Sequence, residues 1–215
     1  MDFFKKGLLV SFEGTEGSGK STLIQEVFLM LKKKGYQVIQ TREPGGSPLA
    51  EKIRKILLHS SMDPKTELFL YEAARTEHLA TSIRPALLEG AIVLCDRFTD
   101  STLAYQAHAR GLPWKEVKAL NQIATSGLDP DLTFFLDIPP EIGLKRAQNP
   151  NRFEAEGLRF QKKVRLGYLK ARAEHPKRWI TLKASHQSPK EMAQSVVTTL
   201  TQRFRIQPFP PARVS

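Results

Sequence analysis

The chain has 215 residues, of which 40% are hydrophobic and 26% charged, and its 33 Lys and Arg against 22 Asp and Glu give a formal net charge of +11. This length fits one globular domain with room for a small inserted lid, and the composition excludes collagen-like and wholly disordered chains. The apolar runs are too short for a membrane-spanning helix, which needs about 20 consecutive apolar residues, and a single cysteine excludes an internal disulfide framework.

Five short apolar runs, partly β-branched, predict buried strands along the chain. They cover residues 8–12, 37–41, 91–95, 132–137 and 179–182. Helical patterns occupy the segments between and after them, at residues 20–34, 48–58, 64–89, 113–124, 140–147, 157–173 and 188–202. This alternation predicts an α/β fold: a five-stranded parallel sheet, with helices on both faces and ligands at the carboxyl ends of the strands.

No repeat, low-complexity tract or interdomain linker interrupts this alternation, so a single domain is expected over residues 1–205. Residues 206–215 are rich in proline and break all periodicity, which predicts a disordered tail. The N-terminal segment passes from a brief basic stretch into the first predicted strand without a small-residue cleavage site. Together with the lone Cys95, this indicates a cytoplasmic protein in a reducing compartment.

A glycine-rich phosphate loop follows the first predicted strand. Residues 14–21 read GTEGSGKS, fit the pattern G-x-x-x-x-G-K-[ST] and lead into the predicted helix at 20–34. Glycines allow backbone amides to point at phosphate oxygens, and Lys20 supplies a point charge for the outer phosphates. An ordinary glycine-rich turn is the alternative, but the strand before and the helix after favour a nucleoside triphosphate site. The expected ATP-binding residues are Gly14, Thr15, Glu16, Gly17, Ser18, Gly19, Lys20, Ser21 and Thr22.

A Mg²⁺ site is expected beside this loop. The Ser21 hydroxyl can ligate the ion, and Asp96 follows a buried strand, where a second carboxylate is needed to hold the metal and its water shell. A helix N-cap is the alternative role for Asp96, and the two roles are compatible.

The net charge of +11 favours anionic partners without identifying them. Its most conspicuous run, residues 32–34, ends a predicted helix and precedes Gly35, which is typical of a capped helix C-terminus. A nucleic-acid surface would show basic residues interleaved with aromatic ones, and no such stripe is visible. We therefore expect neither a nucleic acid nor a membrane as a partner.

Four segments together resemble the thymidylate kinase family, in that family's order and at its intervals. They are residues 12–22 (FEGTEGSGKST), 41–46 (TREPGG), 96–98 (DRF) and 104–106 (AYQ), and the resemblance extends over about residues 8–200. It implies a P-loop nucleoside monophosphate kinase-like fold with a short lid, transfer of the γ-phosphoryl group of ATP to thymidine 5′-monophosphate (dTMP), Mg²⁺ as cofactor and a homodimer packed through helices.

The resemblance also implies a set of acceptor residues. Arg97 and Arg54 would clamp the acceptor phosphate, for which the planar guanidinium fork is suited. Glu16 would contact the sugar 3′-hydroxyl, since an acid beside phosphates is costly without such a role. Phe69 would stack on thymine and Arg75 would bind a base carbonyl, although an aromatic side chain on an apolar helix is usually core. The remaining expected dTMP contacts are Thr102, Tyr105 and Gln106.

One departure from the family pattern concerns the catalytic arginine. Some thymidylate kinases carry a basic residue inside the phosphate loop, whereas this loop holds only Thr15, Glu16, Gly17 and Ser18 before Gly19. The region at about 145–156 resembles the lid of the other subgroup, whose arginines fold over ATP. Arg146 and Arg152 are therefore expected to join Lys20 and Arg97 as catalytic residues, with a charged surface helix end as the alternative for both.

Two other functions remain open on the sequence. A deoxynucleoside kinase would share the phosphate loop but phosphorylate a neutral hydroxyl, and it would not need Arg54 and Arg97 as a phosphate clamp. A nucleic-acid-dependent ATPase is suggested by the net charge and would show ATP turnover stimulated by DNA or RNA, with affinity that falls steeply with salt.

Overall fold

A five-stranded parallel sheet forms the centre of the computed structural model, which describes residues 7–146, 152–183 and 187–204. The strands are β1 (Leu8–Glu13), β2 (Val38–Arg42), β3 (Ile92–Asp96), β4 (Leu132–Leu136) and β5 (Trp179–Leu182), in the spatial order β2-β3-β1-β4-β5. Every strand pair is parallel, with Phe12 on β1 in register with Asp96 on β3 and Phe134 on β4. The predicted strands are confirmed to within one residue at each end.

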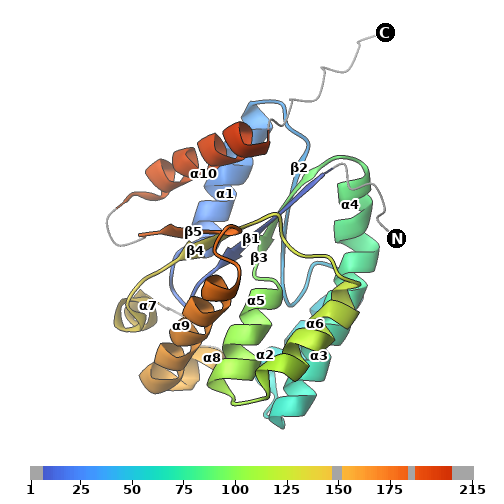
Figure 1. The fold of residues 1–215 in the computed structure, drawn as a ribbon, viewed down its shortest axis with the longest axis vertical. Helices are drawn as coiled ribbons and strands as arrows, with labels where there is room; N and C mark the ends of the chain where they lie inside the picture. The colour runs from blue at the N-terminus through green and yellow to red at the C-terminus, as the bar shows by residue number, and fades with distance from the viewer. Residues whose placement is uncertain (1–6, 147–151, 184–186, 205–215) are drawn as a thin grey trace.

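Helices connect the strands and cover the sheet on both sides (Figure 1). They are α1 (Lys20–Lys33), α2 (Pro48–His59), α3 (Pro64–His78), η1 (Leu79–Ile83), α4 (Arg84–Leu88), α5 (Thr99–Thr102), η2 (Leu103–Ala109), α6 (Trp114–Thr125), α7 (Pro140–Arg146), α8 (Arg152–Ala155), α9 (Gly157–Glu174) and α10 (Pro189–Phe204). The α/β prediction with helices on both faces is confirmed.

The two faces of the sheet carry separate cores because side chains alternate along each strand. Leu8, Val10 and Phe12 of β1 point toward α1 and α10, which pack on each other over this face. Leu9 of β1 belongs to the core on the opposite face, beneath η1 and α4. On that same side η2 and α9 pack closely together beside β4 and β5. Both cores leave the carboxyl edge of the sheet open for the site.

Several helix ends follow the expected chemistry. Ser188 and Glu191 form a capping box, in which Glu191 accepts from the Ser188 amide at 2.8 Å and Ser188 Oγ accepts from the Glu191 amide at 3.3 Å. Gly35 has φ 80° and donates to the Lys32 carbonyl at 3.0 Å, so the lysine run ends α1 as predicted. Ser47 caps α2 by accepting from the Ala50 amide at 3.2 Å.

Two helical predictions are corrected. The segment predicted as one helix at 64–89 is helical from Pro64 to Leu88 but includes the π-helical turn η1, and a similar wide turn forms η2. The helical run from Thr99 to Ala109, α5 with η2, was not predicted. Thr99, Asp100, Ser101 and Thr102 are poor helix formers that are buried here, so tertiary packing outweighs local propensity. Residues 147–151 of the predicted lid and 206–215 of the predicted tail lie outside the described residues.

Candidate active site

The phosphate loop connects β1 to α1 and closes around Lys20. The Lys20 Nζ atom is buried and donates to the carbonyl oxygens of Gly14 and Thr15, both at 3.1 Å, and to Ser18 Oγ at 3.2 Å. Gly17 and Gly19 have φ values of 67° and 89°, which L side chains rarely adopt. Burial and the nearby Arg97 lower the pKa of Lys20 from its ordinary value of 10.5. The loop thus places the Lys20 ammonium group at the start of α1.

Helix α7 is locked against this loop by two glycines. A Cβ on Gly17 would lie 2.0 Å from the Gly143 carbonyl oxygen, and a Cβ on Gly143 would lie 2.2 Å from the Glu16 carbonyl oxygen. The backbones touch because neither residue has a side chain. Arg146 lies one turn beyond Gly143, and this contact places it on the wall of a cleft of about 500 Å³ over the loop.

Ser21 and Asp96 come together at the floor of that cleft. Ser21 Oγ donates to Asp96 Oδ2 at 2.9 Å, although 75 residues separate them. Within the described part of the chain, Asp96 Oδ1 is a buried oxygen without a hydrogen-bond partner. A carboxylate oxygen that is buried and unsatisfied beside a hydroxyl is a suitable ligand pair for Mg²⁺, so these two residues fit the expected metal.

Arg97 lies where the cleft over the phosphate loop meets a second cavity. Its φ of 71° is unusual for a residue with a side chain and turns the guanidinium back toward the loop. The guanidinium donates to Gly14 O at 2.9 Å, Tyr168 Oη at 2.8 Å and Glu16 Oε1 at 2.8 Å. Both cavities are lined by Glu16, Glu43, Arg54 and Arg97. Arg97 therefore lines both the cleft over the phosphate loop and the second cavity.

Glu16 is ionised in this position. Burial alone would raise the pKa of its carboxyl, but the charges of Arg97 and Lys20 outweigh burial and lower the pKa below the ordinary 4.5. Tyr105 Oη also donates to Glu16 Oε1, at 2.9 Å. Arg54 approaches from α2, where its Nη1 donates to Pro44 O at 2.8 Å, and its side chain lines both cavities.

The fully buried carboxylate of Glu13 is connected to Arg97 by a chain of hydrogen bonds. Glu13 Oε1 accepts from the Phe98 amide at 2.8 Å, and Oε2 accepts from Ser101 Oγ at 2.6 Å. Ser101 Oγ lies 2.7 Å from Tyr168 Oη, which contacts Arg97. Burial, with Asp100 nearby, raises the pKa of Glu13 from 4.5 to about 8.

The raised pKa of Glu13 predicts a loss of stability as pH rises. Between the ordinary pKa of a glutamate and the raised pKa of about 8, the folded protein holds a proton on Glu13 that the unfolded chain has released, so the free energy of unfolding falls as pH rises through this range. Glu13→Gln mimics the protonated acid and should make this free energy less dependent on pH. Urea unfolding at pH 6 and pH 8 measures the free energy of unfolding. Glu116→Gln is the control, because Glu116 is exposed on the surface. If the free energy of unfolding decreases equally from pH 6 to pH 8 in the parent and in the Glu13→Gln variant, the expectation is contradicted.

The second cavity has a volume of about 70 Å³ and lies between α2, α3, α5 and η2. It is lined by Glu16, Glu43, Pro44, Arg54, Leu58, Tyr71, Arg75, Arg97, Phe98, Ser101, Thr102, Tyr105, Gln106 and Phe153. The four charged residues Glu16, Glu43, Arg54 and Arg97 are shared with the phosphate cleft, and the rest of the lining combines four aromatic residues with polar side chains that include Arg75 and Thr102. Such a distribution suits an acceptor with a charged end and a flat, mostly apolar end.

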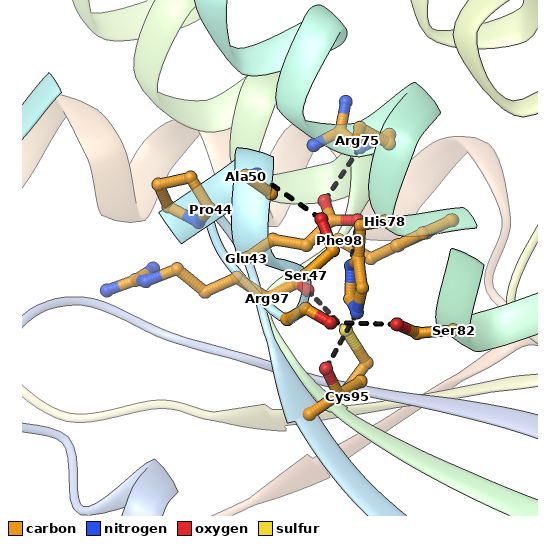
Figure 2. Close-up of polar contacts among 12 residues, drawn as sticks. Glu43, Pro44, Ser47, Ala50, Arg75, His78, Ser82, Cys95, Arg97 and Phe98 are labelled. Carbon is orange, nitrogen blue, oxygen red and sulfur yellow. Dashed lines mark hydrogen bonds and ion pairs between the residues drawn. The ribbon is translucent and has the colours of Figure 1, made fainter. Parts of the chain in front are cut away.

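Glu43 holds Arg75 at the wall of this cavity (Figure 2). Arg75 Nε donates to Glu43 Oε2 at 2.7 Å, and Arg75 Nη2 donates to Thr102 Oγ1 at 2.9 Å. His78 Nδ1 lies 3.1 Å from Glu43 Oε1 and fixes the other carboxylate oxygen. Burial would raise the pKa of Glu43, but Arg75 and the hydrogen bond from His78 lower it. The guanidinium is thereby oriented before any ligand binds.

Phe69, which is expected to stack on the acceptor base, lies away from the acceptor cavity. Its ring is 57% exposed on α3 and does not line the cavity. Tyr71 lines the cavity instead, four residues before Arg75. Residues four apart share one face of a helix, whereas residues six apart do not. The spacing to Arg75 was therefore the signal in the sequence that identifies Tyr71.

Two expected acceptor residues line the cavity but are engaged with protein groups. Thr102 Oγ1 accepts from Arg75, and Gln106 Nε2 donates to Glu67 Oε1 at 2.7 Å. Of the two lid arginines, only Arg146 lines the phosphate cleft. The structure does not bring Arg152 to that cleft, and its Nη2 instead donates to Glu67 Oε2 at 2.6 Å.

Sequence reasoning missed several residues that build the site. Glu43 lies inside the TREPGG segment, but its partner Arg75 is 32 residues away along the chain, so the sequence does not indicate their contact. Phe153, Tyr168 and Gly143 carried no local signal, since each meets its partners through long-range packing. As for membranes, no helix in the described ranges is both long and apolar enough to span a bilayer.

Comparison with known proteins points to one family. The family model described as thymidylate kinase matches residues 12–196. The thymidylate kinase of Lactobacillus helveticus is 50% identical over 208 residues, covering 93% of this chain and 98% of its own. The thymidylate kinase of Shouchella clausii is 52% identical, covering 81% and 85%, and that of Bacillus velezensis is 49% identical, covering 83% and 88%.

Proposed function

We infer that this chain, which belongs to the thymidylate kinase family, transfers the γ-phosphoryl group of ATP to dTMP and so produces thymidine 5′-diphosphate. The observation that carries this function is the junction of the two cavities at Arg97 and Arg54. Two guanidinium groups between a phosphate loop and an aromatic cavity suit an acceptor that already bears a phosphate.

On the donor side, residues 14–22 bind ATP. Backbone amides of the loop and Lys20 surround the outer phosphates, and Arg146 reaches the same cleft from α7. Phosphoryl transfer requires little covalent chemistry from the protein, and its rate depends on positioning and on cations around the transferring group. We assign Lys20 and Arg146 to that electrostatic role. Arg152 is not retained as a catalytic residue, because its guanidinium is engaged elsewhere.

On the acceptor side, Arg97 and Arg54 hold the dTMP phosphate in line with the γ-phosphorus. Glu16 keeps Arg97 oriented through their 2.8 Å ion pair and accepts from the sugar 3′-hydroxyl. Tyr105 lines the sugar site, where its ring disfavours a 2′-hydroxyl. Arg75 and Thr102 face the base edge, and Tyr71 takes the stacking role first given to Phe69.

Mg²⁺ is the proposed cofactor, held by Ser21 and Asp96. The unsatisfied Asp96 Oδ1 atom beside Ser21 supports this assignment. Mg²⁺ bound by these two residues would supply positive charge that offsets the charge on the transferring phosphoryl group. We further propose that the enzyme acts in the cytoplasm as a single domain.

A panel of acceptors tests the reaction. ADP release from ATP and Mg²⁺ is measured with dTMP, deoxyuridine monophosphate, other nucleoside monophosphates, thymidine and single-stranded DNA. We expect a strong preference for dTMP. Turnover with thymidine would favour a deoxynucleoside kinase, and stimulation by DNA alone would favour the nucleic-acid-dependent ATPase.

We also propose that the enzyme is a homodimer packed through α2, α3 and α6. These helices neighbour one another in the fold and expose large apolar side chains. The exposed side chains are Leu49 and Ile56 on α2, Phe69 on α3 and Ile123 on α6. Exposed apolar groups gathered on adjacent elements are typical of a protein interface.

Phe69→Lys should weaken such a dimer by about tenfold or more, because it places a charge within an apolar contact. Analytical ultracentrifugation across a concentration series measures the dissociation constant. Leu166→Lys is the matched control, since Leu166 is similarly exposed on α9, outside this face. A parent protein that is monomeric, or a Phe69→Lys variant that dimerises as well as the parent, would contradict the proposed interface.

A further inference from the structure

A second ionic cluster lies beside the acceptor cavity and is centred on Glu67 of α3. Glu67 is fully buried, yet its carboxylate accepts from Gln106 Nε2 at 2.7 Å, from Arg110 Nη2 at 3.2 Å and from Arg152 Nη2 at 2.6 Å. Arg110 also pairs with Glu156. One carboxylate thus joins α3, η2 and the segment at residues 152–156.

Two nitrogen atoms of the Arg152 guanidinium, Nε and Nη2, donate hydrogen bonds to protein groups. Besides the ion pair with Glu67, its Nε donates to the carbonyl oxygen of Leu57 in α2 at 3.1 Å. Removing a partner from a buried ion pair is strongly unfavourable, because it leaves a charge without compensation. Arg152 is therefore fixed to the acceptor half of the site.

This anchoring sets the position of Phe153, the next residue. The Phe153 ring is 3% exposed and lines the acceptor cavity. Its centroid lies 5.7 Å from that of Tyr105, edge to face, and 6.3 Å from that of Tyr71. The Arg152 guanidinium lies 4.7 Å from the same ring centroid, so a cation–π contact also joins the anchor to the ring.

We propose that Phe153 is an acceptor-positioning residue, which forms a wall of the base pocket with Tyr71, and that the Glu67–Arg152 ion pair holds it there. The proposal rests on the proposed function and adds a determinant of dTMP binding outside helices α2 and α3. It also assigns Arg152 to acceptor binding, as a positioning residue that acts through Phe153. Aromatic rings bind planar bases without specific hydrogen bonds, which explains why a phenylalanine suffices at this position.

The test is calorimetric titration of dTMP and, separately, of ATP, without turnover. Phe153→Ala should weaken dTMP binding by about tenfold, and ATP binding should not change. Glu67→Gln and Arg152→Met should reproduce that selective loss, while Phe153→Tyr should restore most of the affinity. Arg159→Met is the matched control, since Arg159 is exposed on the neighbouring helix α9. In steady-state kinetics, the Phe153→Ala variant should lose kcat/KM for dTMP, while its KM for ATP should not change.

Several results would overturn the proposal. If Phe153→Ala binds dTMP as the parent does, Phe153 has no part in the pocket. If Arg152→Met lowers kcat but leaves dTMP affinity intact, Arg152 acts on the transferring phosphoryl group instead. Should Glu67→Gln fail to fold, Phe153→Ala and Phe153→Tyr still decide the question. A parent protein that binds ATP but not dTMP would contradict the proposed function itself, which separates the two failures.

Discussion

Replacing Lys20 by methionine is expected to lower kcat by about 10³-fold. The Lys20 ammonium is buried inside the phosphate loop and lies within 3.2 Å of three loop oxygens. When the triphosphate enters, this is the cation best placed to offset charge on the outer phosphates. Methionine keeps an unbranched apolar side chain and removes the ammonium group, so the loss reports electrostatics more than packing.

Steady-state kinetics with dTMP measure this loss, and circular dichroism melting checks the fold of the variant. Lys32→Met is the matched control, because Lys32 is exposed in the last turn of the same helix. A Lys20→Met enzyme within about tenfold of the parent kcat would show that Arg146 or the backbone amides carry the charge stabilisation instead.

Replacing Arg97 by lysine is expected to lower kcat/KM for dTMP by about 10²- to 10³-fold. Lysine retains the charge but loses the planar fork, which here donates to Gly14 O and Tyr168 Oη through Nη1 and to Glu16 through Nη2. A bidentate contact to phosphate requires that fork. The unusual φ of 71° at this position means that the fold is built to aim this particular side chain.

A comparison of the kinetic constants for dTMP and for ATP decides how the Arg97→Lys result is interpreted. The loss should appear with varied dTMP, while KM for ATP should change much less. Arg172→Lys is a suitable control, since Arg172 is a partly buried arginine that donates to Thr181 Oγ1. A kcat/KM for dTMP close to that of the parent would argue against a monophosphate acceptor and favour the deoxynucleoside kinase.

The sheet and the donor site were predictable from the sequence because their signals are local. Apolar runs of four to six residues marked every strand, and the glycine spacing before Lys20 marked the phosphate loop. Asp96 followed from its place at the end of a strand. These features need only the order of residues along the chain, and the parallel sheet then brings them to one edge.

The acceptor site was only partly predictable because its residues meet through long-range packing. The family resemblance identifies Arg54, Arg75 and Thr102, whereas Phe69 lies six residues before Arg75 and therefore on another face of the helix. Tyr71 lies four residues before Arg75 and shares its face. The pair Glu67 and Arg152 is separated by 85 residues and carries no periodic signal. Such a pair becomes visible only when the helices are assembled.

The most direct test of the proposed reaction follows the labelled γ-phosphoryl group of ATP into product. Parent enzyme and Lys20→Met are incubated with labelled ATP, Mg²⁺ and dTMP, and the products are separated. We expect the label in the terminal phosphate of thymidine 5′-diphosphate, at a rate that depends on Lys20. Label that appears only in inorganic phosphate, or that moves to thymidine in preference to dTMP, would contradict the assignment of this chain as a kinase that acts on dTMP.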